Sequence, residues 1–494
     1  MKTEELLNLI KIKTIQGIVP DFIEGIQMDS RNVGPGDIFV CITGYTVDGH
    51  EFVEDAVRRG ASMIIAEKEI SHVPDGLCVV RVKDSAKVLA RLASHLYGYP
   101  AAKLSTIGVT GTNGKTTVSH MIHELMGKAG QKSAVAGTLG FRSADTWTPT
   151  PNTTSDILSN LKMLEKAAES DCSAMIFETS SQGLVNGRMW GIELDIAVFT
   201  NLSHDHLDFH KSMESYGHAK GLLFSQLGQD VRKTKFAVLN QDDSWSASFS
   251  RMTPFEIISY GLSAGADFQA SQISYDEQGT EFMLESPAGT FAVKTAFIGK
   301  FNVYNVLAAI AALYAYGMEI ETMLEHLPEI YPVEGRMEKL ASSDGPTVYI
   351  DYAHTPDAIE KAIDSLLLFK KGRLIILIAG GNYRDQLKRP IMAEKASIAD
   401  YVIITTNNPG QEPSREILQA YEKGMLHSRY TLIAERAEAV RHAIRIAEKE
   451  DIVLLTDKGH ETTLLVGDRY LPYNEKEIVL EQLNFQAMNK ERVN

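Results

Sequence analysis

The chain has 494 residues, with 49 Lys+Arg against 64 Asp+Glu, a formal net charge of −15 and 44% hydrophobic residues. This length corresponds to about three domains. The composition is that of a globular protein and excludes a disordered, collagen-like or coiled-coil chain. The acidic balance argues against a general nucleic-acid binder, because phosphate backbones attract basic surfaces. One locally positive pocket can still hold a nucleotide.

Three cysteines, Cys41, Cys78 and Cys172, are too few for a disulfide framework and fit a reducing cytoplasm. The segment 1–16 has acidic residues in its first turn and is typical of an amphipathic helix, not of a signal peptide. No apolar run approaches the roughly 20 residues that span a bilayer. We therefore expect a soluble, cytoplasmic protein with no membrane partner.

Short β-branched runs alternate with helical stretches along the chain, which is typical of parallel sheets with crossover helices and predicts an α/β fold. Three blocks predict three domains: an N-terminal α/β domain (1–98), a central P-loop-type ATPase domain with a mostly parallel sheet (99–332), and a C-terminal Rossmann-like α/β domain (333–494). In chain order, strands are expected at 38–44, 62–68, 77–82, at the start of 107–117, and at 134–138, 173–179, 195–202, 235–240, 257–261, 347–354, 373–381, 401–408 and 451–459. Helices are expected at 51–61, 85–98 and 302–317, and a turn-rich stretch after 261 predicts a small antiparallel sheet.

A glycine-rich turn joins the short apolar strand that begins at Ile107 to a helix. Its residues are Gly111-Thr112-Asn113-Gly114-Lys115-Thr116-Thr117. Such a turn lets backbone N–H groups close around phosphates, and the helix N-terminus faces their charge. Lys115 would reach the terminal phosphates and the Thr116 hydroxyl would bind magnesium. The spacing is not the strict G-x-x-x-x-G-K-[ST], because Val109 stands five residues before Gly114. A tight turn without a ligand is the alternative, but strand, glycines, Lys-Thr and helix occur in the required order.

Acidic and imidazole side chains follow the next strands of the same block. Glu178 ends the strand at 173–179, where α/β sheets place catalytic groups, and would bind magnesium directly or through water; a strand-end acid at a solvent edge is the alternative. The segment 200–210 contains three His and two Asp within seven residues. Zinc is one interpretation, but no Cys joins them and the spacing fits no structural zinc pattern. We favour a second, phosphate-bridged magnesium with His206 as a ligand. Lys220, on the next helix, has on spacing alone the pattern of a solvated lysine.

The third block places polar motifs after three strands. They are Gly380-Gly381-Asn382-Tyr383-Arg384-Asp385, Asn407-Asn408-Pro409-Gly410 and Asp457-Lys458-Gly459-His460-Glu461. Because the carboxyl ends of parallel strands meet at one edge of a sheet, we predict that these motifs line one cleft.

The segments TGTNGKTT, ETSS, TNLSHDHLDFH, HAKGLLF, GKFNVYN, EGRME and DYAHTPD occur in the order found in the Mur ligase family, which the chain therefore resembles. Asp29-Ser30-Arg31, Thr153-Thr154 and the closing KGHE make it similar to the MurE branch, the UDP-N-acetylmuramoyl-tripeptide synthetases of bacterial cell-wall assembly. The resemblance runs from about residue 26 to 480.

The resemblance implies an ATP-dependent amide ligase that uses Mg²⁺. It would join an amino acid, L-lysine or meso-diaminopimelate, to the γ-carboxylate of D-Glu in UDP-MurNAc-L-Ala-D-Glu through an acyl phosphate. This reaction belongs to peptidoglycan synthesis, and so to cell shape and division. The three domains would then bind UDP-MurNAc, ATP and the amino acid in chain order. The partners would be these small molecules, with no nucleic acid, and the protein would be a monomer.

Site residues carried over by position fall into four groups. The nucleotide group is Gly111, Thr112, Asn113, Gly114, Lys115, Thr116, Thr117, Asn302, Asn305, Arg336 and Asp351. The UDP-MurNAc-dipeptide group is Ser30, Asn152, Thr153, Thr154, Ser180, Asn186 and Arg188, and the amino-acid group is Arg384, Asn407, Asn408, Gly410 and Glu461. The metal group is Thr116, Glu178, His206 and Lys220, with Lys220 as a carbamate formed from CO₂. The catalytic residues would be Lys115, Glu178, His206 and Lys220.

Three positions depart from the family pattern. Gln182 stands for the usual His, and Asn382-Tyr383-Arg384 is one residue longer than the usual Gly-Gly-Asp-Arg segment. The loop Asn407-Asn408-Pro409-Gly410 lacks both the acid and the Arg of diaminopimelate enzymes, and the acid that lysine enzymes commonly keep. No neutral side chain reproduces the bidentate grip of Arg on a carboxylate. We therefore expect lysine to be slightly favoured over diaminopimelate.

Two rival functions stay open at this point. One is another ATP-dependent amino-acid ligase, of folylpolyglutamate or secondary-metabolite type, which dependence on UDP-MurNAc-L-Ala-D-Glu would separate. The other is a nucleotide-binding regulatory protein that forms no amide, whose signature would be ATP binding without substrate-triggered phosphate release.

Overall fold

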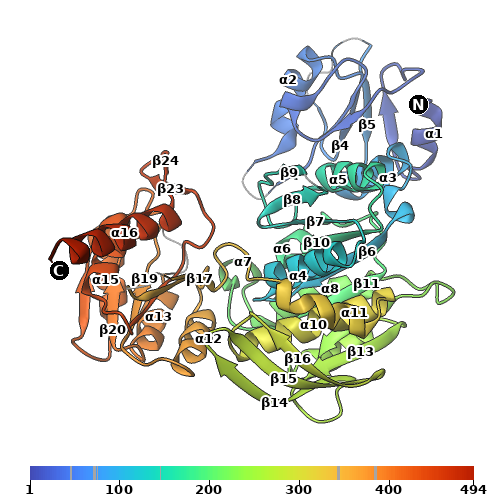
Figure 1. Cartoon of the computed structure of the whole chain (residues 1–494). Helices are drawn as coiled ribbons and strands as arrows, with labels where there is room; N and C mark the ends of the chain where they lie inside the picture. Colours follow the sequence, from blue (N-terminus) through green and yellow to red (C-terminus); the bar gives the residue numbers. More distant parts are fainter. Residues whose placement is uncertain are drawn as a thin grey trace. The chain divides into compact units, whose positions relative to one another are not determined.

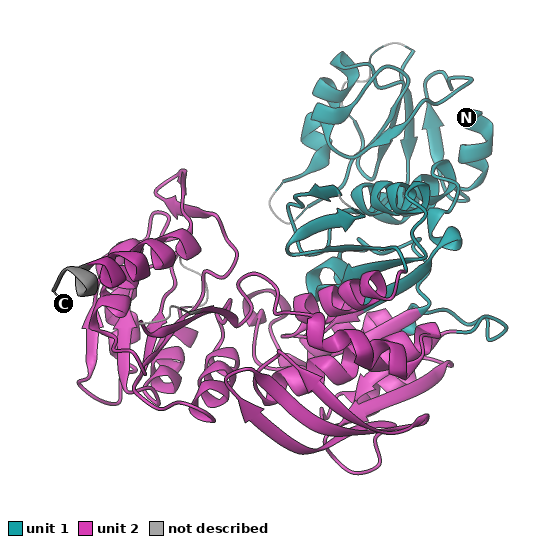
Figure 2. Ribbon diagram, in the orientation of Figure 1, with its two compact units in different colours: residues 1–108, 131–195, 225–234 teal, residues 109–130, 196–224, 235–494 magenta. Residues whose placement is uncertain are grey.

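The computed structural model describes residues 1–44, 47–70, 74, 76–144, 146–341, 345–382 and 386–493. The chain divides into two compact units (Figure 2). The first unit comprises residues 1–108, 131–195 and 225–234, and the second comprises 109–130, 196–224 and 235–494. The boundary falls within β6 (Ser105–Thr110), the strand that leads into the glycine-rich turn.

The N-terminal part of the first unit is a five-stranded sheet in the order β1-β5-β4-β3-β2, parallel except for β1. Its strands are β1 (Thr14–Gln16), β2 (Ile26–Gln27), β3 (Ile38–Val40), β4 (Met63–Ala66) and β5 (Cys78–Arg81). Its helices are α1 (Thr3–Asn8), α2 (Val53–Arg58) and α3 (Ser85–Leu96). The N-terminal prediction was too simple, because the helix ends at Asn8 and the exposed β1 follows it. The other predicted elements of this block are confirmed.

The rest of the first unit carries β7 (Ser133–Gly137), β8 (Gly140–Ser143), β9 (Thr146–Thr148) and β10 (Ala174–Glu178). β10 pairs in parallel with β7, whereas β7, β8 and β9 are antiparallel. α5 (Ile157–Glu169) begins where the Asp156 side chain accepts a hydrogen bond from the Ser159 N–H. The short α6 (Ser181–Val185) follows β10 directly, so the polar residues after Glu178 lie at the carboxyl end of this strand.

The second unit contains strands in the order β16-β15-β14-β13-β12-β11, parallel from β11 to β14. They are β11 (Ile196–Phe199), β12 (Phe236–Asn240), β13 (Glu256–Gly261), β14 (Phe268–Asp276), β15 (Gly279–Ser286) and β16 (Gly289–Thr295). The turn-rich stretch thus forms the antiparallel edge of this sheet and not a separate small one. α10 (Lys300–Tyr316) is apolar on nearly every face because it packs between α4 (Lys115–Lys128) and strands β11 to β14 (Figure 1). Other helices here are α7 (Leu207–His210), α8 (Met213–Ser225), α9 (Ser246–Phe249) and α11 (Ile320–His326).

The C-terminal part of the second unit is a six-stranded sheet in the order β17-β18-β22-β19-β20-β21, parallel except for β17. Its strands are β17 (Glu338–Ala341), β18 (Thr347–Ile350), β19 (Leu374–Ile378), β20 (Tyr401–Ile404), β21 (Tyr430–Leu432) and β22 (Ile452–Leu455). Its helices are α12 (Pro356–Leu367), α13 (Lys388–Ala396), α14 (Ser414–Glu422), α15 (Arg436–Ile446) and α16 (Glu475–Val493), with the hairpin β23 (Thr463–Val466) and β24 (Arg469–Pro472). Apolar clusters cover both faces, which explains the unbroken apolar runs of β19 and β22.

The predicted α/β class with mostly parallel sheets is confirmed. The strands missed in the sequence, such as β1, β9 and β24, are short and exposed, so they lack the apolar run that signals a buried strand. Among the described residues no helix combines the length and apolarity that a membrane crossing requires.

Candidate active site

The glycine-rich turn between β6 and α4 is held in place by the carboxyl end of β11. Gly111 and Gly114 have φ values of +151° and +89°, and a Cβ on Gly111 would lie 1.8 Å from Thr200 Oγ. The Asn201 backbone carbonyl accepts a hydrogen bond from the Thr112 N–H at 2.8 Å, and its side-chain oxygen accepts one from the Asn113 N–H at 3.1 Å. Only glycine fits this approach. Sequence reasoning gave no role to Asn201, because its contacts are made across the sheet.

Two lysines converge on the carbonyl oxygen of Gly111. Lys115 Nζ donates to it at 2.8 Å and to the Thr112 carbonyl at 2.8 Å. Lys220 Nζ donates to the same oxygen at 2.7 Å, lies 4.5 Å from the centre of the Tyr216 ring, and its side chain is 1% exposed. Burial, with repulsion from Lys115, holds the pKa of Lys220 well below its usual range. Lys220 is therefore not the solvated lysine that its spacing alone suggested.

The His-rich segment forms the start of α7. His206 has a φ of +54°, and its Nε2 lies 3.3 Å from Asp205 Oδ2. Burial lowers the pKa of His206 and lowers that of His210 to about 4, so both rings are neutral near pH 7. Among the described residues no group of three or more His, Cys, Asp or Glu side chains has an arrangement that would hold a metal ion. The zinc interpretation has no ligand set there.

A cavity of about 630 Å³ opens beside the turn, within the second unit. Predicted nucleotide positions on its wall are Asn113, Gly114, Thr117, Asn302, Asn305, Arg336 and Asp351. Wall residues not predicted in the sequence include Asn201, Asp242, Asp243, Tyr275, Tyr304, Tyr352 and Lys361. The cavity has the size of an ordinary small-molecule site.

Polar contacts link the turn to the start of the C-terminal part. Arg336 Nη2 donates to Thr116 Oγ at 3.2 Å, and its guanidinium stacks 4.7 Å from the centre of the Tyr352 ring. Asn113 Nδ2 donates to Asp357 Oδ2 at 3.0 Å, from the first turn of α12. Arg336 thus reaches the hydroxyl predicted to serve the metal, although more than 200 residues separate the two.

Asp351 also lies on the cavity wall. Its Oδ2 accepts the Met337 N–H at 2.7 Å, and burial raises the pKa of the carboxyl against the opposing effect of Arg336. The hydrogen bond orients the carboxyl at the end of β18, beside the positions predicted for the nucleotide.

The first unit gathers a second polar cluster around the end of β10. Glu178 is 1% exposed, and its two side-chain oxygens accept from the N–H and the hydroxyl of Thr138, both at 3.0 Å. Thr154 Oγ donates to the Glu178 carbonyl at 2.8 Å, and Arg188 Nη1 donates to the Thr154 carbonyl at 2.7 Å. A Cβ on Gly137 would lie 2.0 Å from Glu178 Oε1, so this glycine makes room for the carboxylate.

The predicted dipeptide residues divide into two sets. Thr153, Thr154, Ser180 and Arg188 lie in this cluster, where Thr153 contacts Thr138 at 3.1 Å. Ser30 lies in the short helix Ser30–Asn32 beside the five-stranded sheet, and Asn152 and Asn186 are exposed.

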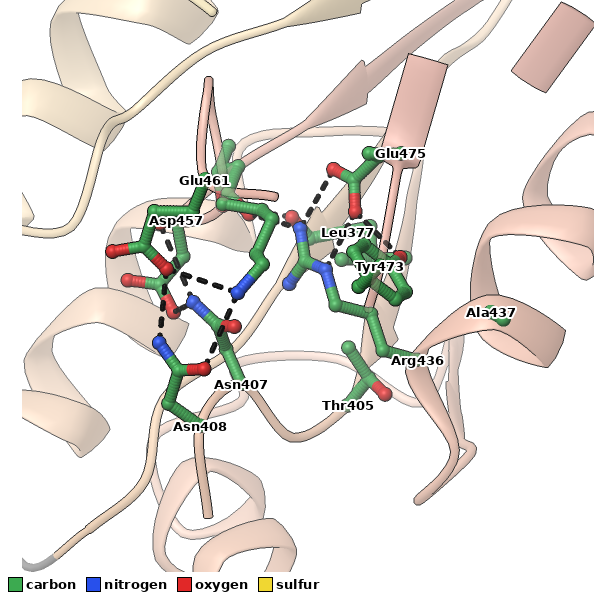
Figure 3. A network of polar contacts seen from close by, with 12 residues as sticks. Leu377, Thr405, Asn407, Asn408, Arg436, Ala437, Asp457, Glu461, Tyr473 and Glu475 are labelled. Atoms are coloured by element: carbon green, nitrogen blue, oxygen red, sulfur yellow. Dashed lines mark hydrogen bonds and ion pairs between the residues drawn. The ribbon is translucent and has the colours of Figure 1, made fainter. Parts of the chain in front are cut away.

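The motifs after β20 and β22 contact each other (Figure 3), and the Asn382 N–H of the motif after β19 donates to the Pro409 carbonyl at 3.2 Å. That the three motifs line one cleft stays a prediction. Asn407 Nδ2 donates to Asp457 Oδ2 at 2.8 Å, and Asn408 Nδ2 donates to Glu461 Oε2 at 2.9 Å. Lys458, with no exposed surface, lies 2.9 Å from the same Glu461 oxygen. The predicted Arg384 lies outside the described residues. Position 407 is Asn and not the acid of the diaminopimelate enzymes, but the carboxylate of Asp457 lies beside it. The sequence analysis gave Asp457 no role in the amino-acid site.

Three family models match successive parts of the chain: the Mur ligase family catalytic domain over residues 22–97, the Mur ligase middle domain over 109–313, and the Mur ligase glutamate ligase domain over 335–459. The chain is 44% identical over 98% of its length, and 99% of the relative's, to UDP-N-acetylmuramyl-tripeptide synthetase 2 of Oceanobacillus iheyensis. The chain belongs to the Mur ligase family. Within that family it is also 42% identical, over 97% of both chains, to a UDP-N-acetylmuramoyl-L-alanyl-D-glutamate--L-lysine ligase of Staphylococcus aureus (strain MW2).

A solved structure of a UDP-N-acetylmuramoyl-L-alanyl-D-glutamate--2,6-diaminopimelate ligase is similar along the whole of this Mur ligase. The two share 30% identity and a TM-score of 0.70 over 99% of each chain. The resemblance read from the motifs and the three-domain Mur ligase fold are therefore confirmed. The roles of the individual site residues stay predictions.

Proposed function

We propose that this Mur ligase is an ATP-dependent amide ligase that adds a diamino acid to the γ-carboxylate of D-Glu in UDP-MurNAc-L-Ala-D-Glu, in cytoplasmic peptidoglycan synthesis. The observation that carries the proposal is the convergence of Lys115 and Lys220 on the Gly111 carbonyl, at the N-terminus of α4 and beside a 630 Å³ cavity. The curated relatives over the whole chain are named for this chemistry.

ATP occupies the cavity of the second unit in this proposal. The N–H groups at the start of α4 face the phosphates, and Lys115 leaves the two carbonyls that it contacts here to bind the terminal phosphate. Arg336 and the Asn302–Asn305 pair hold the rest of the nucleotide, and Asn305 is fixed by its 2.9 Å hydrogen bond to Asn302. The γ-carboxylate of the dipeptide attacks the γ-phosphorus and releases ADP, and the resulting acyl phosphate loses phosphate when the amine attacks its carbonyl carbon.

Magnesium fits the donor chemistry of the predicted metal group, because the Thr116 hydroxyl and the Glu178 carboxylate are hard oxygen donors. The neutral His206 would supply a nitrogen to a second ion. When bound, the metal neutralises charge that develops on the phosphoryl oxygens. Thr116 Oγ accepts a hydrogen bond from Arg336, and the Glu178 carboxylate accepts one from the Thr138 N–H. These contacts orient both oxygens in the absence of the metal.

Lys220 is proposed to act as a carbamate. Burial holds the pKa of Lys220 well below its usual range and so favours the neutral amine, whose nitrogen can form a bond to the carbon of CO₂ with loss of one proton. The product carries oxygen ligands, whereas an ammonium would repel a nearby cation. Burial against the Tyr216 ring and the Gly111 carbonyl supports this role.

The polar cluster around Glu178 is proposed to receive the dipeptide end of UDP-MurNAc-L-Ala-D-Glu, with Ser30 holding another part of it. The cluster offers hydroxyls from Thr153, Thr154 and Ser180, and the Arg188 cation. The protein is proposed to act as a monomer on small molecules only.

The test is ADP release with UDP-MurNAc-L-Ala-D-Glu and L-lysine, meso-diaminopimelate or no amino acid. We expect sustained ADP release only when both the dipeptide nucleotide and a diamino acid are present. Release with a folate and glutamate in their place would favour the folylpolyglutamate type of ligase. ATP binding without release under any condition would favour a regulatory protein.

A further inference from the structure

Near the carboxyl ends of β20 and β22, Figure 3 shows two ion pairs among the described residues, Arg436–Glu475 and Lys458–Glu461, beside the carboxylate of Asp457. Arg436 and Glu475 are both fully buried and joined by two hydrogen bonds of 2.6 and 2.8 Å. Lys458 pairs with Glu461 at 2.9 Å and also donates to the Thr463 carbonyl. These pairs compensate their own charges, as buried charges must.

The carboxylate of Asp457 belongs to neither ion pair. Its side-chain hydrogen bond within the described residues comes from the neutral Asn407 amide, at 2.8 Å on Oδ2, and Oδ1 receives none there. Asp457 is half-buried, and its backbone φ is +76°, in the left-handed region that non-glycine residues seldom adopt. One negative charge therefore has no cationic hydrogen-bond partner in this part of the described chain.

The neighbours of Asp457 do not remove this charge. Burial raises the pKa of its carboxyl, Arg436, His354 and the Asn407 amide oppose that rise, and Glu461 adds to it. Arg436 is already committed to Glu475, and His354 Nδ1 contacts the Tyr352 carbonyl at 2.7 Å. A cationic ligand group would complete the cluster at little cost, because the Asn407 amide already orients the carboxylate.

We propose that Asp457, oriented by Asn407, is the counter-ion for a lone terminal ammonium group on the incoming amino acid. The inference rests on the proposed function and narrows its substrate to a basic amino acid of the lysine class. The terminal group is the one that fits, because a carboxylate stabilises a charged ammonium whereas the attacking α-amine must be neutral. A distal carboxylate would approach both Asp457 and Glu461 and be repelled.

The test compares L-lysine with L-norleucine, which has the same carbon chain without the terminal amine. Ligation to UDP-MurNAc-L-Ala-D-Glu is measured as kcat/KM for both in the parent, in Asp457→Asn and in Asp468→Asn. Asp468 is an exposed acid in the nearby β23–β24 turn and serves as the matched control. We expect the parent and Asp468→Asn to prefer lysine by about 100-fold or more, and Asp457→Asn to lose at least about tenfold of that preference, mainly through KM for lysine.

A charge-relocation variant keeps the test decisive if Asp457→Asn is poorly folded. Asn407→Asp combined with Asp457→Asn moves the carboxylate to the other side of the same hydrogen bond, and we expect it to recover most of the preference. Equal losses for lysine and norleucine in Asp457→Asn would overturn the inference and assign Asp457 to proton transfer or folding. A parent that ligates both amino acids equally overturns the inference alone, whereas a parent that releases no ADP with any amino acid overturns the proposed function as well.

Discussion

At the scale of single residues, the glycine-rich turn concentrates its positive charge in two lysines with different surroundings. Lys115 is only partly buried and bound to two backbone carbonyls that a phosphate can replace. Lys220 is sealed from solvent and shares one of those carbonyls. The positive charge of Lys115 disfavours a second charge on Lys220 and lowers the pKa of Lys220 further. We therefore expect substitutions of Lys115 and Lys220 to reduce ligation for different reasons.

Lys115→Ala should abolish ligation while the fold is kept. Loss of a transition-state charge contact costs on the order of 3 kcal/mol, or about a hundredfold in rate. The measurement is kcat for ADP release, with Lys128→Ala as the control, since Lys128 is an exposed residue at the other end of α4. Turnover of Lys115→Ala within about threefold of the parent would show that Lys115 does not act on the phosphates.

Lys220→Ala should be nearly inactive, and a small carboxylate such as acetate should restore part of the activity. The reason is that the added anion supplies the oxygen ligands that the carbamate would provide. Activity is measured over an acetate series and, for the parent, in buffer depleted of CO₂, with the exposed Lys233→Ala as control. Full activity of Lys220→Ala would rule out the carbamate role.

At the scale of elements, a buried ion pair joins α15 to the start of α16. Arg436 and Glu475 have no more than 1% exposed side-chain surface, and the Tyr473 hydroxyl donates to Glu475 at 2.8 Å. Glu475→Gln leaves the Arg436 charge uncompensated and should lower the free energy of unfolding by about 3–5 kcal/mol. Denaturant titration measures this change. The control Glu438→Gln breaks an exposed pair on α15 and should cost less than about 1 kcal/mol. Equal effects of the two variants would contradict the prediction.

The backbone of the loop after β20 disfavours any side chain at Gly410, the position where diaminopimelate enzymes carry an Arg. Gly410 has a φ of +57°, its N–H donates to the Leu465 carbonyl at 3.1 Å, and a Cβ there would lie 2.7 Å from Asn382 Oδ1. An arginine at this position would be strained, so Gly410→Arg tests folding as much as selectivity. The predicted preference for lysine over meso-diaminopimelate is therefore measured in the parent protein, where kcat/KM for lysine should exceed that for meso-diaminopimelate. A preference for diaminopimelate above about a hundredfold, near 3 kcal/mol, would show that another residue replaces the Arg.

At the scale of the whole molecule, the 630 Å³ cavity that we propose binds ATP is lined entirely by residues of the second unit. A ligand at about 100 times its Kd stabilises the state that binds it by about 2.7 kcal/mol. Because chains with separate compact units need not unfold in one step, Mg-ADP should raise the melting temperature of the second unit more than that of the first.

Tryptophan fluorescence distinguishes the two units. Trp147 and Trp190 belong to the first unit and Trp245 to the second. In a Trp245→Phe variant, the fluorescence transition therefore reports the first unit, whereas calorimetry reports both. An equal shift of both transitions on adding Mg-ADP would contradict a cavity confined to the second unit.

Local patterns in the sequence determined the α/β class, the glycine-rich turn between a strand and a helix, and the Mur ligase family. They did so because alternating apolar runs, glycines before Lys-Thr and ordered motifs depend only on neighbouring residues. The tertiary structure decided what depends on distant partners: the burial of Lys220, the hydrogen bonds of Asn201 to the turn, and the position of Asp457, which among the described residues is hydrogen-bonded by the neutral Asn407 amide and by no cation. Whether a charged side chain is solvated or buried is set by elements packed from elsewhere in the chain, and no local pattern contains that information.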